Sequence, residues 1–113
     1  MDQIDTMSPT GDNHIRLEFT DRFDRWLLNL RDRKAQARIT VRLQRLERGL
    51  WGDVKPVGEG VSELRIAHGP GYRLYLFKRD AAWVVMLAGG DKSSQRRDIE
   101  EAKSLAREFR RAD

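Results

Sequence analysis

Apolar and polar residues alternate in several short stretches of the chain. This period of two predicts β-strands, because successive side chains point to opposite faces of a sheet. The alternation is clearest in Val61–Ala67 and Tyr72–Lys78. Trp83–Ala88 is apolar at every position, which is typical of a strand covered on both faces. His14–Phe19 alternates as well, and Val54–Val57 is a short candidate edge strand because the proline inside it cannot donate a ladder hydrogen bond.

Helical periodicity predicts three helices between and after these strands. The first follows Thr20, which is a good N-cap, and carries one apolar stripe at the spacing i, i+3, i+4 and i+7. The second begins after Asp32 and ends before Gly49. The third spans about Ser94–Phe109, with Ser93 or Ser94 as its N-cap.

The order β-α-α-β-β-β-β-α predicts an α+β fold. Short connections among the last strands indicate a small, mainly antiparallel twisted sheet. The first two helices form a hairpin that should pack on one face of this sheet, followed later by the C-terminal helix. We expect the other face to stay open and to carry polar side chains.

Composition restricts the possible functions of the chain. It has 113 residues and no cysteine, so disulfides and thiol chemistry are excluded. No apolar run approaches the roughly 20 residues that a membrane span needs, and we expect a cytoplasmic protein without a membrane partner. The polar stretch 1–13 predicts a flexible N-terminal tail before a single domain over 14–113.

A surplus of basic residues permits a polyanionic partner such as nucleic acid. The chain has 22 Lys and Arg against 18 Asp and Glu, a formal net charge of +4. Part of this charge lies on the second helix, beside its apolar stripe, at Arg38, Arg42 and Arg45. These arginines form either a solvated basic face or a surface that contacts phosphate backbone.

A candidate anion site lies on the two clearest strands. Arg65 and Arg73 fall on the polar faces of adjacent strands, where a pair of guanidinium groups can hold one phosphate. Tyr75 lies two residues from Arg73 and is a candidate for stacking on a base. The alternative is a pair of surface arginines bridged to Glu63 or Asp91, beside an exposed aromatic ring.

Several motifs in this region resemble a known toxin family. They are ELR at Glu63–Arg65, GPGYR at Gly69–Arg73, GGDKSSQ at Gly89–Gln95, and the pair Asp98-Ile99. Together with the Trp26-Leu27 helix and the Gly52–Lys55 connector they are similar to the RelE/ParE toxin superfamily. Within it they resemble the HigB-like addiction module killer branch of type II toxin–antitoxin systems, over about Ile15–Leu105.

The resemblance implies a toxin that a cognate antitoxin neutralises, with a helix-turn-helix HigA-like protein as the expected antitoxin. The ribonuclease members of this superfamily cut mRNA on the ribosome, without a metal or cofactor, by attack of a ribose 2′-hydroxyl on the adjacent phosphate. Operator DNA would be contacted only through the antitoxin. The superfamily also contains DNA gyrase poisons without nuclease chemistry, and inactive relatives that act only in an antitoxin–operator complex, so both remain alternatives.

Metal-free cleavage of RNA needs a proton acceptor, cations for the crowded phosphorane and a proton donor for the leaving oxygen. The candidate catalytic residues are Arg65, Arg73 and Lys92, of which Lys92 follows the last strand, where the resemblance places catalytic groups. The candidate RNA-binding residues are Lys55, Tyr75, Asp91, Arg38, Arg42 and Arg45. Asp91 has helix entry as its alternative role. His14 and His68 do not form a two-histidine ribonuclease pattern, which leaves the general base open.

Overall fold

The computed structural model describes residues 14–112, which form one five-stranded sheet and three α-helices. The order along the chain is that expected, β-α-α-β-β-β-β-α, with a short 3₁₀ turn before the last helix. The elements are β2 (Arg16–Phe19), α1 (Asp21–Leu28), α2 (Arg33–Glu47), β3 (Val54–Gly58), β4 (Val61–Ile66), β5 (Tyr72–Asp80), β6 (Trp83–Asp91), η2 (Lys92–Ser94) and α3 (Gln95–Ala112). The predicted tail at 1–13 lies outside the described residues.

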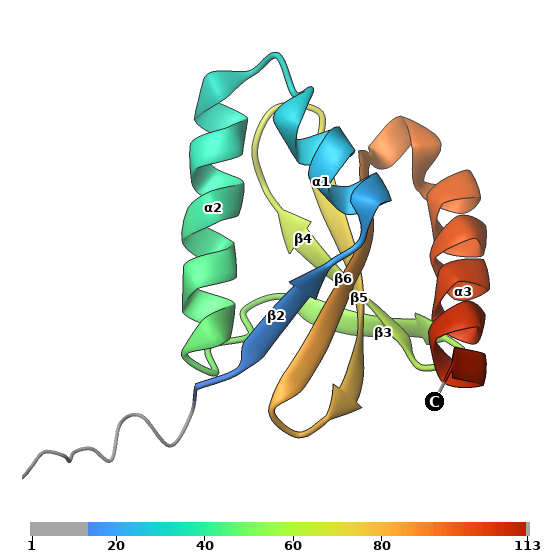
Figure 1. Ribbon diagram of the computed structural model, residues 1–113. Coiled ribbons are helices and arrows are strands. Elements are labelled where there is room, and N and C mark those ends of the chain that lie inside the picture. Colours follow the sequence, from blue (N-terminus) through green and yellow to red (C-terminus); the bar gives the residue numbers. More distant parts are fainter. Residues whose placement is uncertain (1–13, 113) are drawn as a thin grey trace, which may run out of the picture.

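The sheet has the strand order β2-β6-β5-β4-β3 (Figure 1). Strands β3 to β6 form an antiparallel meander, as predicted from their short connections. Strand β2 pairs in parallel with β6 at one edge of the sheet, and β3 occupies the other edge. The central strands β5 and β6 are therefore the best protected, and they carry the longest ladder.

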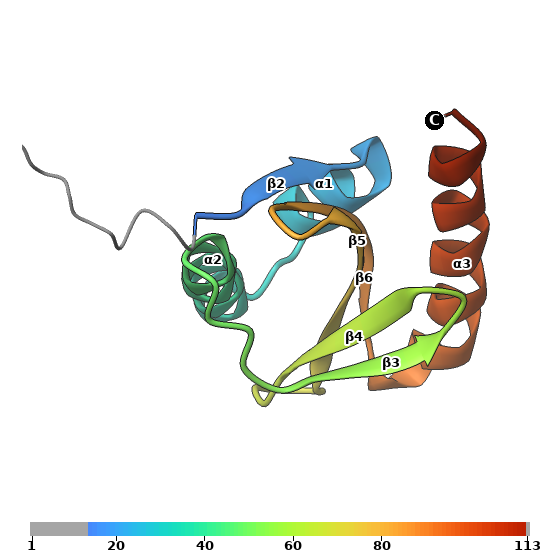
Figure 2. The ribbon, with the colours of Figure 1, turned by 90° about the horizontal axis from the view of Figure 1, so that it is seen from below.

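Helices cover both faces of this sheet. The hairpin of α1 and α2 lies on one side and α3 on the other (Figure 2). The core under α1 and α2 includes Phe23, Ile39, Leu46, Leu74 and Met86. The core under α3 is smaller and includes Val61, Tyr75, Phe77, Leu87 and Ala102.

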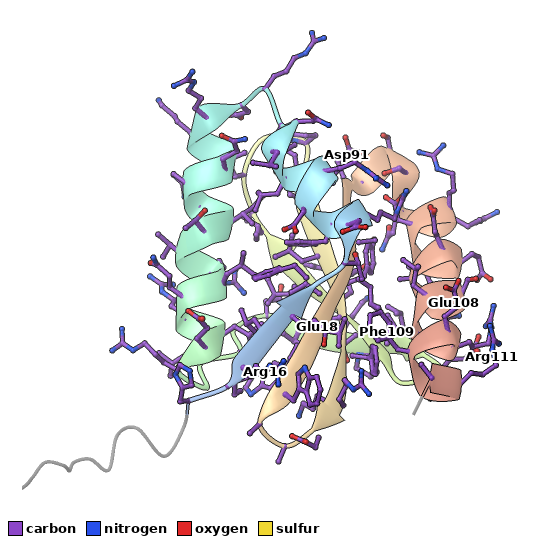
Figure 3. The ribbon with its side chains drawn as sticks, viewed as in Figure 1. Arg16, Glu18, Asp91, Glu108, Phe109 and Arg111 are labelled. Atoms are coloured by element: carbon purple, nitrogen blue, oxygen red, sulfur yellow. The ribbon has the colours of Figure 1, made fainter. Side chains whose placement is uncertain are left out.

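The expectation of an open polar face is therefore wrong over most of its length. The alternation in β4 and β5 predicts one apolar face and one solvent-exposed face, but Tyr75 and Phe77 pack beneath α3. Charged side chains on this face lie near both ends of α3, with Arg73 close to its first turn and Arg79 over the ring of Phe109. Asp91 precedes that first turn, whereas Arg111 lies at the opposite end of the helix (Figure 3).

The two predicted caps of the helical hairpin are confirmed. The hydroxyl of Thr20 accepts a hydrogen bond from the Phe23 amide, and the carboxylate of Asp32 accepts one from the Ala35 amide. Gly49 follows α2 with a φ of 81°, a left-handed conformation that glycine adopts without a steric penalty.

Strand β6 is longer than predicted, because Gly89 and Gly90 continue it instead of ending it. A Cβ at Gly89 would collide with the Trp26 ring, and one at Gly90 would collide with Asp98 and Ser94. The glycines thus let α1 and α3 approach the same strand from opposite faces.

The predicted cap at Ser93 or Ser94 is also wrong, since the Asp91 side chain caps the turn η2 that leads into α3.

Candidate anion-binding site

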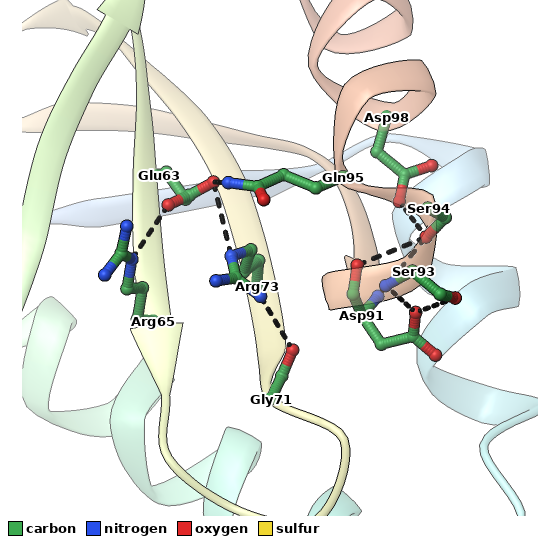
Figure 4. A network of polar contacts seen from close by, with 9 residues as sticks. All are labelled: Glu63, Arg65, Gly71, Arg73, Asp91, Ser93, Ser94, Gln95 and Asp98. Carbon is green, nitrogen blue, oxygen red and sulfur yellow. Dashed lines mark hydrogen bonds and ion pairs between the residues drawn. The ribbon is translucent and has the colours of Figure 1, made fainter.

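A buried carboxylate stands at the centre of the charged cluster between β4, β5 and α3. Glu63 is completely buried, and its two oxygens contact different partners (Figure 4). Oε1 accepts a hydrogen bond from Arg65 Nε at 3.0 Å. Oε2 accepts one from Gln95 Nε2 at 2.8 Å and lies 3.5 Å from Arg73 Nε. One carboxylate therefore connects both arginines to the first turn of α3.

Strand register brings the two arginines together as predicted. Arg65 and Arg73 are directly opposite each other in the β4–β5 ladder. The Arg65 side chain is 39% exposed, whereas that of Arg73 is 11% exposed and donates from Nη1 to the Gly71 carbonyl at 3.1 Å. The Nε of Arg73 is buried and has no hydrogen-bond partner among the described residues. Arg65 is thus accessible to solvent, whereas Arg73 is mostly buried.

The arginines and Gln95 keep Glu63 ionised. Burial by itself would raise the pKa of Glu63, because it removes water from the charged form. Hydrogen bonds from Arg65 and Gln95, with the charges of Arg73 and Arg65, outweigh burial and hold the pKa below its usual value. The bridge to Glu63 that was the structural alternative is therefore present, and it fixes the geometry of both guanidinium groups.

A cavity of about 410 Å³ opens beside this pair. It lies where β4 and β5 approach their connecting turn, and α2 contributes one side chain to its wall. Its lining residues are Arg42, Asp53, Arg65, Ile66, Ala67, Gly71, Tyr72 and Arg73. Three guanidinium groups against one carboxylate give the cavity a positive character suited to an anion.

Tyr75 does not lie where base stacking would require it. The side chain is completely buried beneath α3, and its hydroxyl has no hydrogen-bond partner among the described residues. Burial, followed by the negative charges of Glu63 and Asp98, raises the pKa of Tyr75. The prediction of an exposed aromatic ring is wrong, because alternation alone does not reveal that α3 covers this face.

The other candidates on the sheet differ in their accessibility. Lys55 is exposed and pairs with Glu63 in the β3–β4 register, so it belongs to the same row of the sheet. Lys92 is exposed at the start of η2, directly after Asp91, whose backbone pairs with Tyr72. Both lysines are therefore free to approach a ligand at this end of the sheet.

Asp91 performs the helix-entry role that was its alternative. Its Oδ1 accepts hydrogen bonds from the amide of Ser93 at 2.9 Å and from the hydroxyl of Ser93 at 2.6 Å. These bonds to Ser93 lower the pKa of Asp91, and the charge of Arg73 adds to the effect. Its carboxylate stabilises the turn that carries Lys92.

The three arginines of α2 do not form a uniform surface. Arg38 and Arg45 are exposed, whereas Arg42 turns inward. Arg42 Nη1 donates to the Arg65 carbonyl at 2.9 Å, and its Nη2 is buried without a hydrogen-bond partner among the described residues. A second cavity, of about 500 Å³, lies along this helix and is lined by Lys34, Ala37, Arg38, Val41, Arg42, Arg45, Ile66 and Ala67.

The protein-family comparison identifies the relationship of the chain. A model described as "Phage derived protein Gp49-like (DUF891)" matches residues 11–110. The chain belongs to this family. The Gp49-like chain is also 47% identical over 95 residues to an uncharacterized protein of Haemophilus influenzae, and the match covers 84% of this chain and 96% of the relative.

A solved structure has a similar fold. The Gp49-like chain superposes with a TM-score of 0.55 on a chain of the toxin–antitoxin complex RelBE2 from Mycobacterium tuberculosis. The two are 25% identical, and the alignment covers 70% of this chain and 99% of the other. This similarity confirms the RelE-like α+β fold predicted from the sequence.

Two residues of the Gp49-like site have structural roles that the sequence did not indicate. The sequence indicates Glu63 only as a possible partner for surface arginines, yet it is the buried centre of the cluster. Gln95 appeared only as part of a motif, yet its amide connects α3 to Glu63. The alternation of a strand does not show whether a charged residue is buried. That depends on which side chains of other elements lie against it.

His68 has a structural contact in the Gp49-like fold. Its Nε2 lies 3.1 Å from Oδ2 of Asp32, and its ring stacks on Tyr72 with centroids 6.4 Å apart. It therefore connects the β4–β5 turn to the N-terminus of α2.

No described helix is long and apolar enough to cross a membrane.

Proposed function

We propose that the chain is the toxin of a type II toxin–antitoxin pair, close to the HigB-like branch, and an endoribonuclease that cuts mRNA on the ribosome. The observation that carries this proposal is the Arg65–Arg73 pair, which Glu63 and Gln95 hold at the edge of a positive cavity. Membership of the Gp49-like family and the fold shared with a chain of RelBE2 support the assignment to toxin–antitoxin systems.

The proposed reaction is transesterification within the RNA strand. The 2′-oxygen loses its proton and forms a bond to the adjacent phosphorus. The bond from phosphorus to the 5′-oxygen then breaks, leaving a 2′,3′-cyclic phosphate and, after protonation of that oxygen, a 5′-hydroxyl. No metal or cofactor enters this scheme, because the proton transfers and the charge stabilisation come from side chains.

The arginines would stabilise the charge that develops on the phosphorane. A guanidinium group already fixed by a neighbouring carboxylate needs little reorganisation when the phosphate becomes more negative. Arg65 is exposed enough to contact the phosphate, and Arg73 stands directly opposite it, with its Nε ion-paired to Glu63. Lys92 and Lys55 are the exposed cations available for proton transfer and for binding the strand.

The ribosome would supply the positioning that this small domain lacks. A few cations bind a phosphate backbone without placing one 2′-hydroxyl in line with its phosphate, and such placement is worth several orders of magnitude in rate. We propose that ribosomal RNA contacts the exposed arginines of α2, Arg38 and Arg45, and presents the mRNA to the site.

The antitoxin is proposed to be a helix-turn-helix protein that covers part of this basic surface and connects the pair to operator DNA. Basic residues outnumber acidic ones in the chain, so an acidic segment in the antitoxin would associate faster at low salt. The chain of RelBE2 with the similar fold comes from a complex of this kind.

A gyrase poison without nuclease chemistry is the second candidate. The burial of Tyr75 favours it, because the expected base-stacking ring is absent from the surface. Expression of the chain without an antitoxin separates the two. New mRNA 5′ ends without DNA damage support the endoribonuclease, whereas DNA damage with intact transcripts supports the gyrase poison.

A further inference from the structure

The inward turn of Arg42 sets it apart from the other basic residues of α2. Arg42 lines both the cavity at Arg65 and Arg73 and the cavity along α2, and the two cavities also share Ile66 and Ala67. Its guanidinium group therefore stands at the junction between them. A ligand that leaves the first cavity on this side must pass Arg42 to enter the second.

The loop before β3 is shaped to receive this guanidinium group. A Cβ at Gly52 would collide with Arg42 Nη2, and Gly52 has a φ of 72°, a conformation that side chains disfavour. The bond from Nη1 to the Arg65 carbonyl fixes the other side of the group. Arg42 is thus held in one place by the backbone of two separate segments.

Within the described residues, Arg42 Nη2 is a buried guanidinium nitrogen of the first cavity without a hydrogen-bond partner, whereas Arg73 Nε faces Glu63 Oε2 at 3.5 Å. A buried donor without an acceptor costs about 1–3 kcal/mol, so an anion that supplies acceptors there is favoured. Burial, followed by repulsion from Arg45, lowers the pKa of Arg42 below its usual value, although the charge of Asp53 in the same cavity acts in the opposite direction.

We propose that Arg42 is a second phosphate-binding site, and that a single RNA strand runs from the Arg65–Arg73 pair past Arg42 into the cavity along α2. This inference rests on the proposed function and adds the path of the strand to it. Phosphates follow one another along a nucleic acid, which matches two adjoining basic cavities. The Ala37, Val41 and Ile66 side chains in the second cavity offer apolar surface for a base.

The test is the binding of the purified chain to a fluorescent single-stranded RNA whose 2′-hydroxyls are methylated, so that it cannot be cut. Anisotropy titrations at several salt concentrations would compare the wild type with Arg42→Ala. We expect affinity to fall about tenfold, and the slope of log K against log salt to decrease by about 0.7, the value for one lost phosphate contact on a single strand. Arg48→Ala, an exposed arginine at the end of the same helix that lines neither cavity, is the matched control and should change neither quantity.

Gly52→Ala is the second variant, because it keeps the charge but displaces the guanidinium group. It should weaken binding in the same direction, and thermal melting would establish that each variant is folded. Arg42→Lys should recover part of the affinity, since a lysine keeps the charge but not the planar fork.

Equal affinity and salt slope for folded Arg42→Ala and wild type would overturn the inference. So would displacement of the RNA by poly-glutamate of equal charge, which would assign the cavity to an acidic protein segment.

The same experiment separates this inference from the proposed function. Binding of the methylated RNA that depends on Arg42, with no cleavage of mRNA on ribosomes, would refute the endoribonuclease and retain the phosphate site. Cleavage on ribosomes with RNA binding indifferent to Arg42 would retain the endoribonuclease and refute the path of the strand.

Discussion

Arg65 and Arg73 stand directly opposite each other on β4 and β5, and their Nε atoms contact the two oxygens of one buried carboxylate. Two like charges in this position would repel each other without a partner between them. Glu63 compensates this repulsion and fixes both side chains, while Arg65 keeps part of its guanidinium group at the surface. The pair is therefore organised before any ligand arrives.

Arg73→Ala should abolish toxicity, and it should lower stability without unfolding the protein, because buried Glu63 keeps Arg65 and Gln95 as partners. The change removes one of the two cations proposed to stabilise the phosphorane, and the loss of one such group lowers rates by about 10²–10³-fold. Growth arrest and mRNA cleavage at equal expression would measure the effect, with circular dichroism to verify folding. Arg111→Ala, at the far end of α3, is the control and should remain fully toxic. A folded Arg73→Ala protein that still arrests growth would remove Arg73 from the site.

Glu63→Gln should destabilise the protein by about 1–3 kcal/mol at neutral pH, because it removes a buried charge that both arginines contact. The pKa of Glu63 is lowered in the folded state, so its contribution is present above the ordinary carboxyl pKa and is lost as pH falls through the lowered value. Thermal melts from pH 7 downwards should therefore show a difference between the two proteins that shrinks as pH falls below the ordinary carboxyl pKa of about 4.3. A constant difference across this range would contradict an ionised Glu63.

Gly90→Ala should destabilise the protein by about 1–3 kcal/mol, because the added methyl group collides with Asp98 and Ser94 of the segment that enters α3. The change should also lower activity, since Gln95 in the first turn of α3 holds Glu63. Chemical unfolding and toxicity assays would measure both effects. Ser104→Ala, at an exposed position of the same helix, should stay within about 0.5 kcal/mol of the wild type. Wild-type stability of Gly90→Ala would mean that α3 packs less closely on β6.

Reversal of charge at both Arg38 and Arg45, by substitution with glutamate, should weaken cleavage on ribosomes and leave the Arg65–Arg73 pair unchanged. These two side chains are exposed on α2 and are proposed to contact ribosomal RNA. Ribosome co-sedimentation and cleavage of a translated message would be measured at several salt concentrations. A protein with Arg31→Glu and Arg111→Glu has the same net charge, and should behave as the wild type. Equal losses in both double variants would indicate a general charge effect rather than a specific face.

The sequence predicted the order of the elements, both caps of the helical hairpin and the pairing of Arg65 with Arg73. These features depend on local periodicity, on side chains that cap helices and on short connections, all of which are properties of neighbouring residues. The burial of Tyr75 could not be predicted in the same way. It depends on where α3 docks, and the alternation in β5 is the same whether a helix or water covers that face.

The role of Glu63 and the position of Arg42 depend on contacts between distant segments. Glu63 is 32 positions from Gln95, and Arg42 is 23 positions from Arg65. On α2 the helical period places Arg42 beside Arg38 and Arg45, yet the backbone at Gly52 approaches the guanidinium group of Arg42. Sequence periodicity indicates which face of a helix a residue occupies, but not which loop approaches that face.

The most direct test of the proposed function is to compare one message, free and under translation, in a purified system containing the toxin. The proposal predicts that free mRNA stays largely intact, and that the same mRNA is cut within its coding region when ribosomes translate it. The new ends should carry a 5′-hydroxyl, and Arg73→Ala should produce none of them. Efficient cleavage of the free message at the same sites would contradict dependence on the ribosome, and an intact message under both conditions would contradict the endoribonuclease itself.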